Sequence, residues 1–169
     1  FAIAEACGVT SGEEANALLS LMHELGHVVY FADDMYLRDL VVLNPEWLTK
    51  AIGYVLEDQA TRTAGGVLQH DRLQEIWGPS LDRPGYDRKF HPYFLRLMEK
   101  FDVSYRLEPD DASLVGQLTP WERPALPWEH DTPLAPGERR VRVVFRLAEP
   151  APGLMSWLTV RNHTHAVET

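Results

Sequence analysis

The chain has 169 residues, 45% of them hydrophobic, and it carries a formal net charge of −9 at pH 7. Such a chain can bury one large or two small packed cores, so the composition excludes a wholly disordered protein. The acidic balance disfavours nucleic acid as a partner, because Lys and Arg side chains supply most of the non-specific affinity for phosphates. We therefore expect a protein partner.

Targeting signals are absent from the sequence. No stretch approaches the roughly 18 uninterrupted apolar residues of a membrane span, and the first residues lack the basic segment and cleavage site of a signal peptide. Cys7 is the only cysteine, which excludes an internal disulfide and a zinc cluster built on thiolates. The chain also begins without Met. We expect an excised part of a cytoplasmic protein that does not contact a membrane.

The first 43 residues predict two short helices and a hairpin. An alanine-rich turn ends at Gly8, a residue suited to a left-handed helix cap. Thr10 or Ser11 can cap the next helix, because acidic residues follow in its first turn. β-branched and aromatic residues favour strands on both sides of Asp33 and Asp34, which have turn chemistry. The expected elements are helices over 1–8 and from Thr10 or Ser11 to Gly26, and strands over 27–31 and 40–43.

A second unit starts at Asn44, which can cap a helix that has Pro45 at its first position and Glu46 in its first turn. The apolar residues of this helix follow a helical period and indicate one buried face. The order helix, strand, helix, helix, strand, strand is that of a complete winged helix. The expected elements are helices over 44–56, 73–77 and 91–101, and strands over 65–69, 103–107 and 113–118.

The two units repeat one pattern. In each, a Leu-x-Leu-Met segment is followed by a helix end, a strand and a pair of aspartates. The matched segments are 19–22 with 95–98, 33–34 with 110–111, and Gly26 with Asp102. We therefore expect an α+β chain with a tandem winged-helix fold, each unit a helix-turn-helix with a β-hairpin wing. The paired aspartates are interpreted as turn residues at the hairpin tips.

The C-terminal part differs in kind. Its prolines, with Trp121 and Trp128, predict an extended linker. Alternating apolar residues predict a strand over 139–147, and an apolar run predicts a short helix over 153–162. These apolar side chains must cover a surface, so we expect them to dock on the winged-helix pair. The expected domains are 1–43, an incomplete first winged helix; 44–118, the second; 119–138, the linker; and 139–169, a partial α/β segment that begins another subdomain.

Residues 23–27 read HELGH and match the HExxH pattern, in which two helical histidines hold zinc and the glutamate acts as general base. The local sequence argues against that site, because Gly26 weakens the helix and a strand is expected from His27 onward. The second unit has no histidine at the same helix end. We therefore assign no metal, cofactor or catalytic residue, and we interpret His163 and His165 as exposed tail residues.

A family resemblance rests on ordered segments at 21–26, 29–33, 43–48, 66–68, 91–92, 95–101 and 153–161. Together they resemble the COR region of bacterial Roco-family GTPases, and Leu-Asn-Pro-Glu-Trp-Leu at 43–48 is the most distinctive. The resemblance implies a preceding Ras-like GTPase domain, named Roc, that often follows leucine-rich repeats. It also implies that residues 1–118 form the first COR subdomain, which packs against Roc and senses its nucleotide. The tail would begin the second, dimer-forming subdomain.

The leading hypothesis is a non-catalytic regulatory and dimerisation scaffold, which couples the Roc GTPase domain of the same polypeptide to its partner. The full-length protein is expected to form a homodimer and to bind neither nucleic acid nor a cofactor. Two alternatives remain open: an HExxH zinc metallopeptidase that uses His23, Glu24 and His27, and a DNA-binding winged-helix regulator. The expected core residues are Leu97, Met98 and Phe101, on a helix face that we expect to be buried in both copies of the repeat. The expected interface residues are Leu154, Met155, Trp157 and Leu158.

Overall fold

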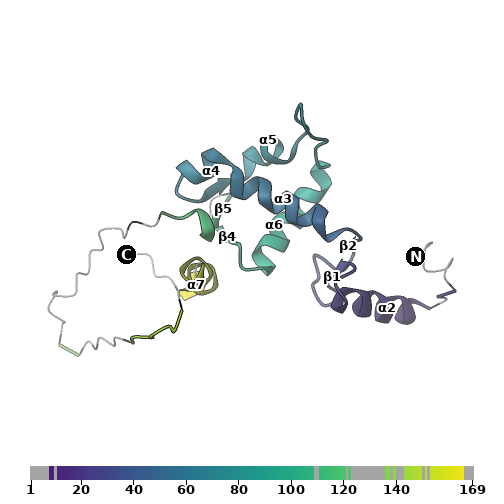
Figure 1. Ribbon diagram of the computed structural model, residues 1–169, viewed down its shortest axis with the longest axis horizontal. Coiled ribbons are helices and arrows are strands. Elements are labelled where there is room, and N and C mark those ends of the chain that lie inside the picture. The colour runs from purple at the N-terminus through teal and green to yellow at the C-terminus, as the bar shows by residue number, and fades with distance from the viewer. Residues whose placement is uncertain are drawn as a thin grey trace.

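The computed structural model has two small antiparallel sheets with helices around them, which confirms the α+β part of the expected fold (Figure 1). It describes residues 8–9, 11–108, 111–120, 122, 136–137, 139, 143–149, 151 and 153–165. The described helices are α2 (Gly12–Glu24), α3 (Pro45–Glu57), α4 (Gln59–Thr63), α5 (Leu73–Trp77), α6 (His91–Lys100) and α7 (Leu154–Asn162). The strands are β1 (Val29–Tyr30), β2 (Val41–Val42), β3 (Val67–Gln69), β4 (Ser104–Leu107) and β5 (Ala112–Val115). No helix in the described ranges is long and apolar enough to cross a membrane.

The N-terminal unit consists of α2 and the β1–β2 hairpin. Ser11 caps α2, because its hydroxyl oxygen accepts a hydrogen bond from the Glu14 amide at 3.1 Å. The two strands pair antiparallel with Val29 opposite Val42. Each strand has only two residues, shorter than expected, because the connecting segment folds into a turn in which the Arg38 amide bonds to the Asp34 carbonyl at 2.8 Å.

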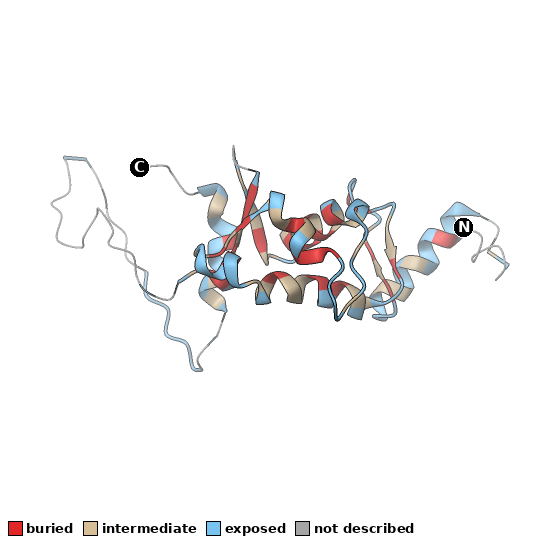
Figure 2. Cartoon of the chain, turned by 90° about the horizontal axis from the view of Figure 1, so that it is seen from above, coloured by how far each residue is buried: buried red, intermediate tan, exposed pale blue. Residues whose placement is uncertain are grey.

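Helix α2 packs weakly against the rest of the chain. Ala15 is its one buried residue, whereas Leu18 and Leu21 in the helix and Leu25 at its C-terminal cap are exposed. Figure 2 shows this N-terminal helix coloured mostly as exposed or intermediate. The equivalent segment of α6 is buried, with Leu97 and Met98 at 1% and 0% exposure. The expectation that both copies of the repeat present a buried face is therefore wrong for α2. Within the described residues, the additional helices and the third strand that cover such a face belong to the second unit.

Helix α3 starts as expected at Asn44. The Asn44 side chain accepts a hydrogen bond from the Glu46 amide at 3.0 Å, and Pro45 occupies the first helical position. Its buried residues recur at the spacing of one helix face. They are Leu48, Ala51 and Val55.

The second sheet has the strand order β3-β5-β4 and is antiparallel throughout. Val67 pairs with Leu114 at one side of β5, and Ser104 pairs with Val115 at the other. After β5 the chain turns into a short 3₁₀ segment, Gly116–Leu118, so the strand expected to reach residue 118 ends at Val115. The expected order of helices and strands between 44 and 118 is observed, with α4 as an additional helix.

The core of this larger unit is built on Trp77. Its indole is 0% exposed, and its Nε1 donates a hydrogen bond to the Ala51 carbonyl at 2.9 Å. The Trp77 ring lies 5.0 Å from that of Phe94, which in turn lies 4.8 Å from Trp47 and 5.1 Å from Tyr86. These edge and tilted contacts between aromatic rings join α3, α5 and α6 around one centre.

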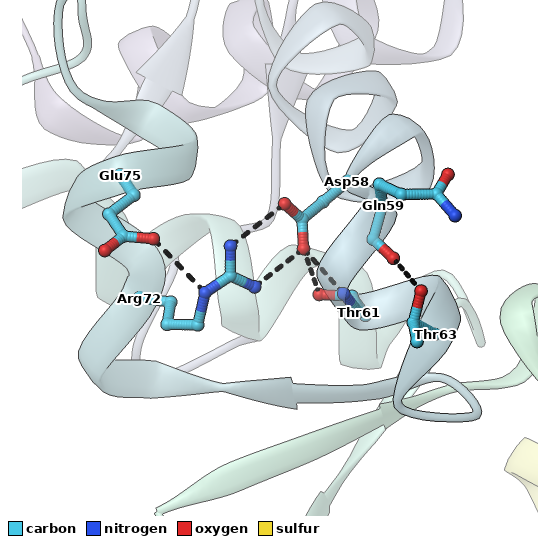
Figure 3. A network of polar contacts seen from close by, with 6 residues as sticks. All are labelled: Asp58, Gln59, Thr61, Thr63, Arg72 and Glu75. Atoms are coloured by element: carbon cyan, nitrogen blue, oxygen red, sulfur yellow. Dashed lines mark hydrogen bonds and ion pairs between the residues drawn. The ribbon is translucent and has the colours of Figure 1, made fainter.

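A polar network joins the end of α3 to α5 (Figure 3). The Asp58 carboxylate caps α4, since it accepts bonds from the Thr61 amide and hydroxyl at 2.7 and 2.6 Å. It also accepts hydrogen bonds from the two terminal nitrogens of Arg72, at 2.8 and 3.1 Å. Hydrogen bonding from Arg72, opposed by partial burial and assisted by Thr61, lowers the pKa of Asp58 from 3.8 to about 2.

Several sequence expectations fall outside the described residues. They are the helix over 1–7 with Cys7, most of the linker with Trp121 and Trp128, and Asp110. Of the strand expected over 139–147, residues 139 and 143–147 are described, and they are not part of a sheet. That strand prediction is wrong for the described part, because alternation alone does not provide a neighbouring strand with which to pair. The helix expected over 153–162 is confirmed as α7.

Substitution of Leu97 or Met98 by Ala should lower the free energy of unfolding by about 2 to 5 kcal/mol, because each removes buried apolar volume from α6. Phe101 was expected to behave alike, but it is 46% exposed at the helix end, so that expectation is corrected. Phe101→Ala is therefore the matched control and should cost about 1 kcal/mol or less. Urea unfolding followed by circular dichroism measures all three variants, and equal losses would contradict this assignment of the core.

The Asp58 pair should make stability depend on acid pH. A carboxyl whose pKa is lowered on folding stabilises the fold above its ordinary pKa, and this stabilisation is lost as pH falls through the folded value. With a shift from 3.8 to about 2, wild type should exceed Asp58→Asn by about 2 kcal/mol at pH 7 and by less than about 0.5 kcal/mol at pH 2. Urea unfolding of both proteins across this range provides the measurement. A difference that is constant with pH would refute the role of the charge.

Candidate functional site

The HELGH segment ends a helix, as expected from Gly26. Helix α2 stops at Glu24, and Gly26 adopts a left-handed φ of 76°. His27 follows that turn and is exposed, so it does not share a helix face with His23. The His23 ring packs edge-on against Phe31 at 5.1 Å, with its Nδ1 3.3 Å from a backbone carbonyl. The described residues contain no group of three His, Cys, Asp or Glu side chains arranged to hold a metal ion.

The ends of α2 and α6 have the same backbone geometry. The His27 amide bonds to the Met22 carbonyl at 2.9 Å, and the Val103 amide bonds to the Met98 carbonyl at 2.9 Å. The left-handed position between each pair is Gly26 in the first case and Asp102, with φ 55°, in the second. The expected correspondence of the two helix ends is thus observed in their hydrogen bonds.

Asp34 was interpreted as a turn residue, and it does accept a bond from the Tyr36 amide at 3.0 Å. Its side chain is only 5% exposed, however, and it pairs with Arg96 at 3.3 Å and Lys100 at 3.5 Å on α6. Burial raises the pKa of Asp34, but the Tyr36 amide and the nearby Arg96 charge outweigh it, so the pKa is lowered overall. Asp34 therefore joins the first hairpin to the second unit.

Asp33 and Asp111, the other described aspartates of the two pairs, differ in their surroundings. Asp33 is exposed. Asp111 lies 2.6 Å from His70 Nδ1, while His70 Nε2 lies 2.8 Å from the Ser113 hydroxyl. His70 follows β3 and Asp111 precedes β5, so this contact joins the two strands at their paired ends. Asp111 is therefore more than a turn residue at a hairpin tip.

A groove of about 1320 Å³ runs between the Asp34 loop, α6, β4 and α7. It is open, and charged side chains of both signs line it together with tyrosines. Many of these charges are paired within the groove. The Glu99 carboxylate, for example, forms ion pairs with Arg96 at 3.1 Å and with Arg106 at 3.6 Å. Charges neutralised in this way do not select a strongly acidic or basic ligand. The groove is mainly a place where separate segments meet.

Helix α7 forms one wall of this groove and docks on the second unit (Figure 1). Val160 is 3% exposed and packs beside Gly116. The Trp157 indole donates to Asp102 Oδ2 at 3.1 Å, and Arg161 Nε lies 3.2 Å from the same oxygen. The tail therefore docks as expected, but polar groups make much of the contact.

The residues expected at an interface are mostly on the open side of α7. Met155 is 72% exposed, Trp157 40% and Leu158 37%, while Leu154 is half-buried. Phe145 and Leu147, also expected to dock, are exposed too. Positions 156, 160 and 163 pack against the second unit at helical spacing. Beside them, the polar groups of Trp157 and Arg161 bind Asp102.

Sequence reasoning missed the side chains that connect distant parts of the chain. His163 was interpreted as an exposed tail residue, but its ring stacks on Tyr105 at 4.2 Å with an angle of 12°, so that interpretation is corrected. His165 is exposed, as expected. The one local signal available was Asp102, an unusual residue at a position where the first copy has glycine.

Comparison with known proteins identifies the family of the chain. Residues 1–119 match the family model described as C-terminal of Roc, COR-A domain. A probable serine/threonine-protein kinase, pats1, of Dictyostelium discoideum is 32% identical over 126 residues, which are 71% of this chain and 4% of that protein. A Roc-COR-CHAT protease of an unknown prokaryotic organism is 29% identical over 155 residues, 88% of this chain and 13% of that protein.

A solved structure has a similar fold. The structure of Methanosarcina barkeri Roco2 RocCORdC bound to GDP matches with a TM-score of 0.55 and 27% identity, over 65% of this chain and 33% of that chain. The chain thus spans a small part of the relatives that it matches. The family model covers well over half of the chain, so the protein belongs to the COR-A family and is a COR domain of a Roco protein.

Proposed function

We propose that this chain is a non-catalytic regulatory and dimerisation scaffold, which couples the Roc GTPase domain of its own polypeptide to a partner through protein contacts. The observation that carries the proposal is the match of residues 1–119 to a family defined by its place after Roc. The similar archaeal structure is named for Roc and COR together and is bound to GDP. A COR domain beside a nucleotide-binding domain is well placed to respond to its conformation.

The proposal includes that the chain itself catalyses no reaction. The HELGH segment lacks the continuous helix that would put His23 and His27 side by side, which weighs against a zinc metallopeptidase. The Asp58 carboxylate, whose pKa is lowered, is engaged in the ion pair with Arg72 and in the cap of α4. The pairing of Arg96 and Lys100 with Asp34 likewise serves to join segments. We place the protein in the cytoplasm because of its single cysteine.

The winged-helix description belongs to the same proposal. The sheet order β3-β5-β4, with α5 and α6 between β3 and β4, is the arrangement that a winged helix requires, which supports residues 44–118 as one such unit. The matching ends of α2 and α6 favour a common origin for residues 1–43. We propose the boundaries 1–43, 44–118, 119–138 and 139–169 on this basis. The acidic first turn of α2, with Glu13 and Glu14, opposes DNA binding by the first unit.

Coupling to Roc predicts binding that depends on nucleotide. The chain should bind the Roc domain of its own polypeptide with affinities that differ by about tenfold between the GDP form and the form loaded with a non-hydrolysable GTP analogue. That factor corresponds to about 1.4 kcal/mol, within the usual range of coupling free energies. Isothermal titration calorimetry measures both constants, with an unrelated Ras-like GTPase as control. Equal affinities for both forms, or equal binding to the control, would refute the coupling.

Dimerisation predicts a different behaviour of the parent protein and of this chain. The open side of α7 should contribute to a dimer contact only in the full-length protein, because a stable dimer needs about 1,000 Å² or more of interface. Met155→Glu should therefore dissociate the full-length dimer, whereas Ala60→Glu on the exposed side of α4 should not. Light scattering after size exclusion measures the mass. A concentration-independent dimer of the 169-residue chain alone would contradict the prediction that the full-length protein is needed for a stable dimer.

A further inference from the structure

Asp102 is the one non-glycine residue with positive φ among the described residues, at 55°. Its counterpart at the end of α2 is Gly26, and the two helix ends have the same pattern of backbone hydrogen bonds. A left-handed residue with a side chain is less stable than glycine, although aspartate tolerates the conformation better than most. An aspartate at this position therefore suggests that its side chain has a task that glycine could not perform.

That side chain holds α7. Its Oδ2 atom accepts a hydrogen bond from Trp157 Nε1 at 3.1 Å and lies 3.2 Å from Arg161 Nε. The Arg161 guanidinium also lies 4.9 Å from the centre of the Trp157 ring, so the two α7 residues support one another. Among the described residues, Asp102 is the one carboxylate that binds the Trp157 indole and the Arg161 guanidinium.

Gly116 makes the close approach of α7 possible. A Cβ atom at this position would lie 2.7 Å from the Ser156 carbonyl oxygen and 2.8 Å from Val160 Cγ2, both in α7. The φ of Gly116 is not positive, so the need for glycine comes from the neighbouring helix and not from its own backbone. Tyr105 completes the contact surface by stacking with His163.

We propose that Asp102, Tyr105 and Gly116 form a receptor site for α7 of the same chain, and that α7 is a releasable clasp over the groove. The contacts that define the site are the bonds of Trp157 and Arg161 to Asp102 and the stacking of His163 on Tyr105. They are limited in extent, since Val160 is the one fully buried residue of α7 and the Arg161 side chain is 58% exposed. Release removes one wall of the groove and frees Asp102 from both of its partners.

The clasp can be tested by hydrogen exchange of the whole chain measured by mass spectrometry. A nine-residue helix is not stable alone in water, so protection of the α7 amides reports its docking. Asp102→Gly removes the carboxylate while it relieves the left-handed position, and Gly116→Ala blocks the approach of the helix. Each should reduce protection of α7 by about tenfold or more and leave α6 and β4 protected. Asp102→Asn keeps an acceptor for Trp157 and should have a smaller effect.

Two variants serve as controls. Glu108→Gln changes another carboxylate of the groove, and Gly53→Ala adds a methyl group where no atom lies within 4 Å. Neither should change α7. Unaltered α7 protection in both Asp102→Gly and Gly116→Ala would overturn the receptor site. Protection of α7 that increases with protein concentration in wild type would show that a second copy supplies the helix, which would overturn the assignment to the same chain.

Discussion

The buried indole of Trp77 sets the geometry on which the larger unit depends. An indole N–H taken out of water needs an acceptor, and the Ala51 carbonyl inside α3 provides it at 2.9 Å. This bond fixes the separation and rotation of α5 relative to α3, while Phe94 brings α6 against the same ring. Leu68 and Val115 of the sheet belong to the same core and are 0% exposed. Loss of this bond with the indole retained would leave an unpaired N–H in the centre of the fold.

Local chemistry made much of this fold predictable. Asn44 with Pro45 predicts the start of α3, and the structure has the helix beginning there. Periodicity also gave the positions of α5, α6 and α7 to within a residue or two. Strand lengths were overestimated, since the residues at 27–31 favour extension but only two of them find a pairing partner. The short helix α4 went unnoticed, although Asp58 carries a recognisable capping signal for it.

Burial was harder to predict than secondary structure. Leu21 and Leu97 occupy equivalent places in the repeat, yet Leu21 is 52% exposed and Leu97 1%. The difference arises from what surrounds each helix, which a pattern of apolar residues cannot specify. The same applies to Asp34, whose cationic partners Arg96 and Lys100 lie more than sixty residues away. Contacts of this kind depend on how the units pack, so they cannot be predicted from the sequence of either unit alone.

The C-terminal half of α6 is held from two directions. On one side, Asp34 anchors the first hairpin to Arg96 and Lys100; just beyond the helix, Asp102 anchors α7. A packed helix moves nearly as a rigid rod, since its interior side chains leave few voids to absorb a displacement. A small axial rotation of α6 would therefore shift both anchors at once. Helix α6 is therefore the element through which a displacement of the N-terminal hairpin would reach α7.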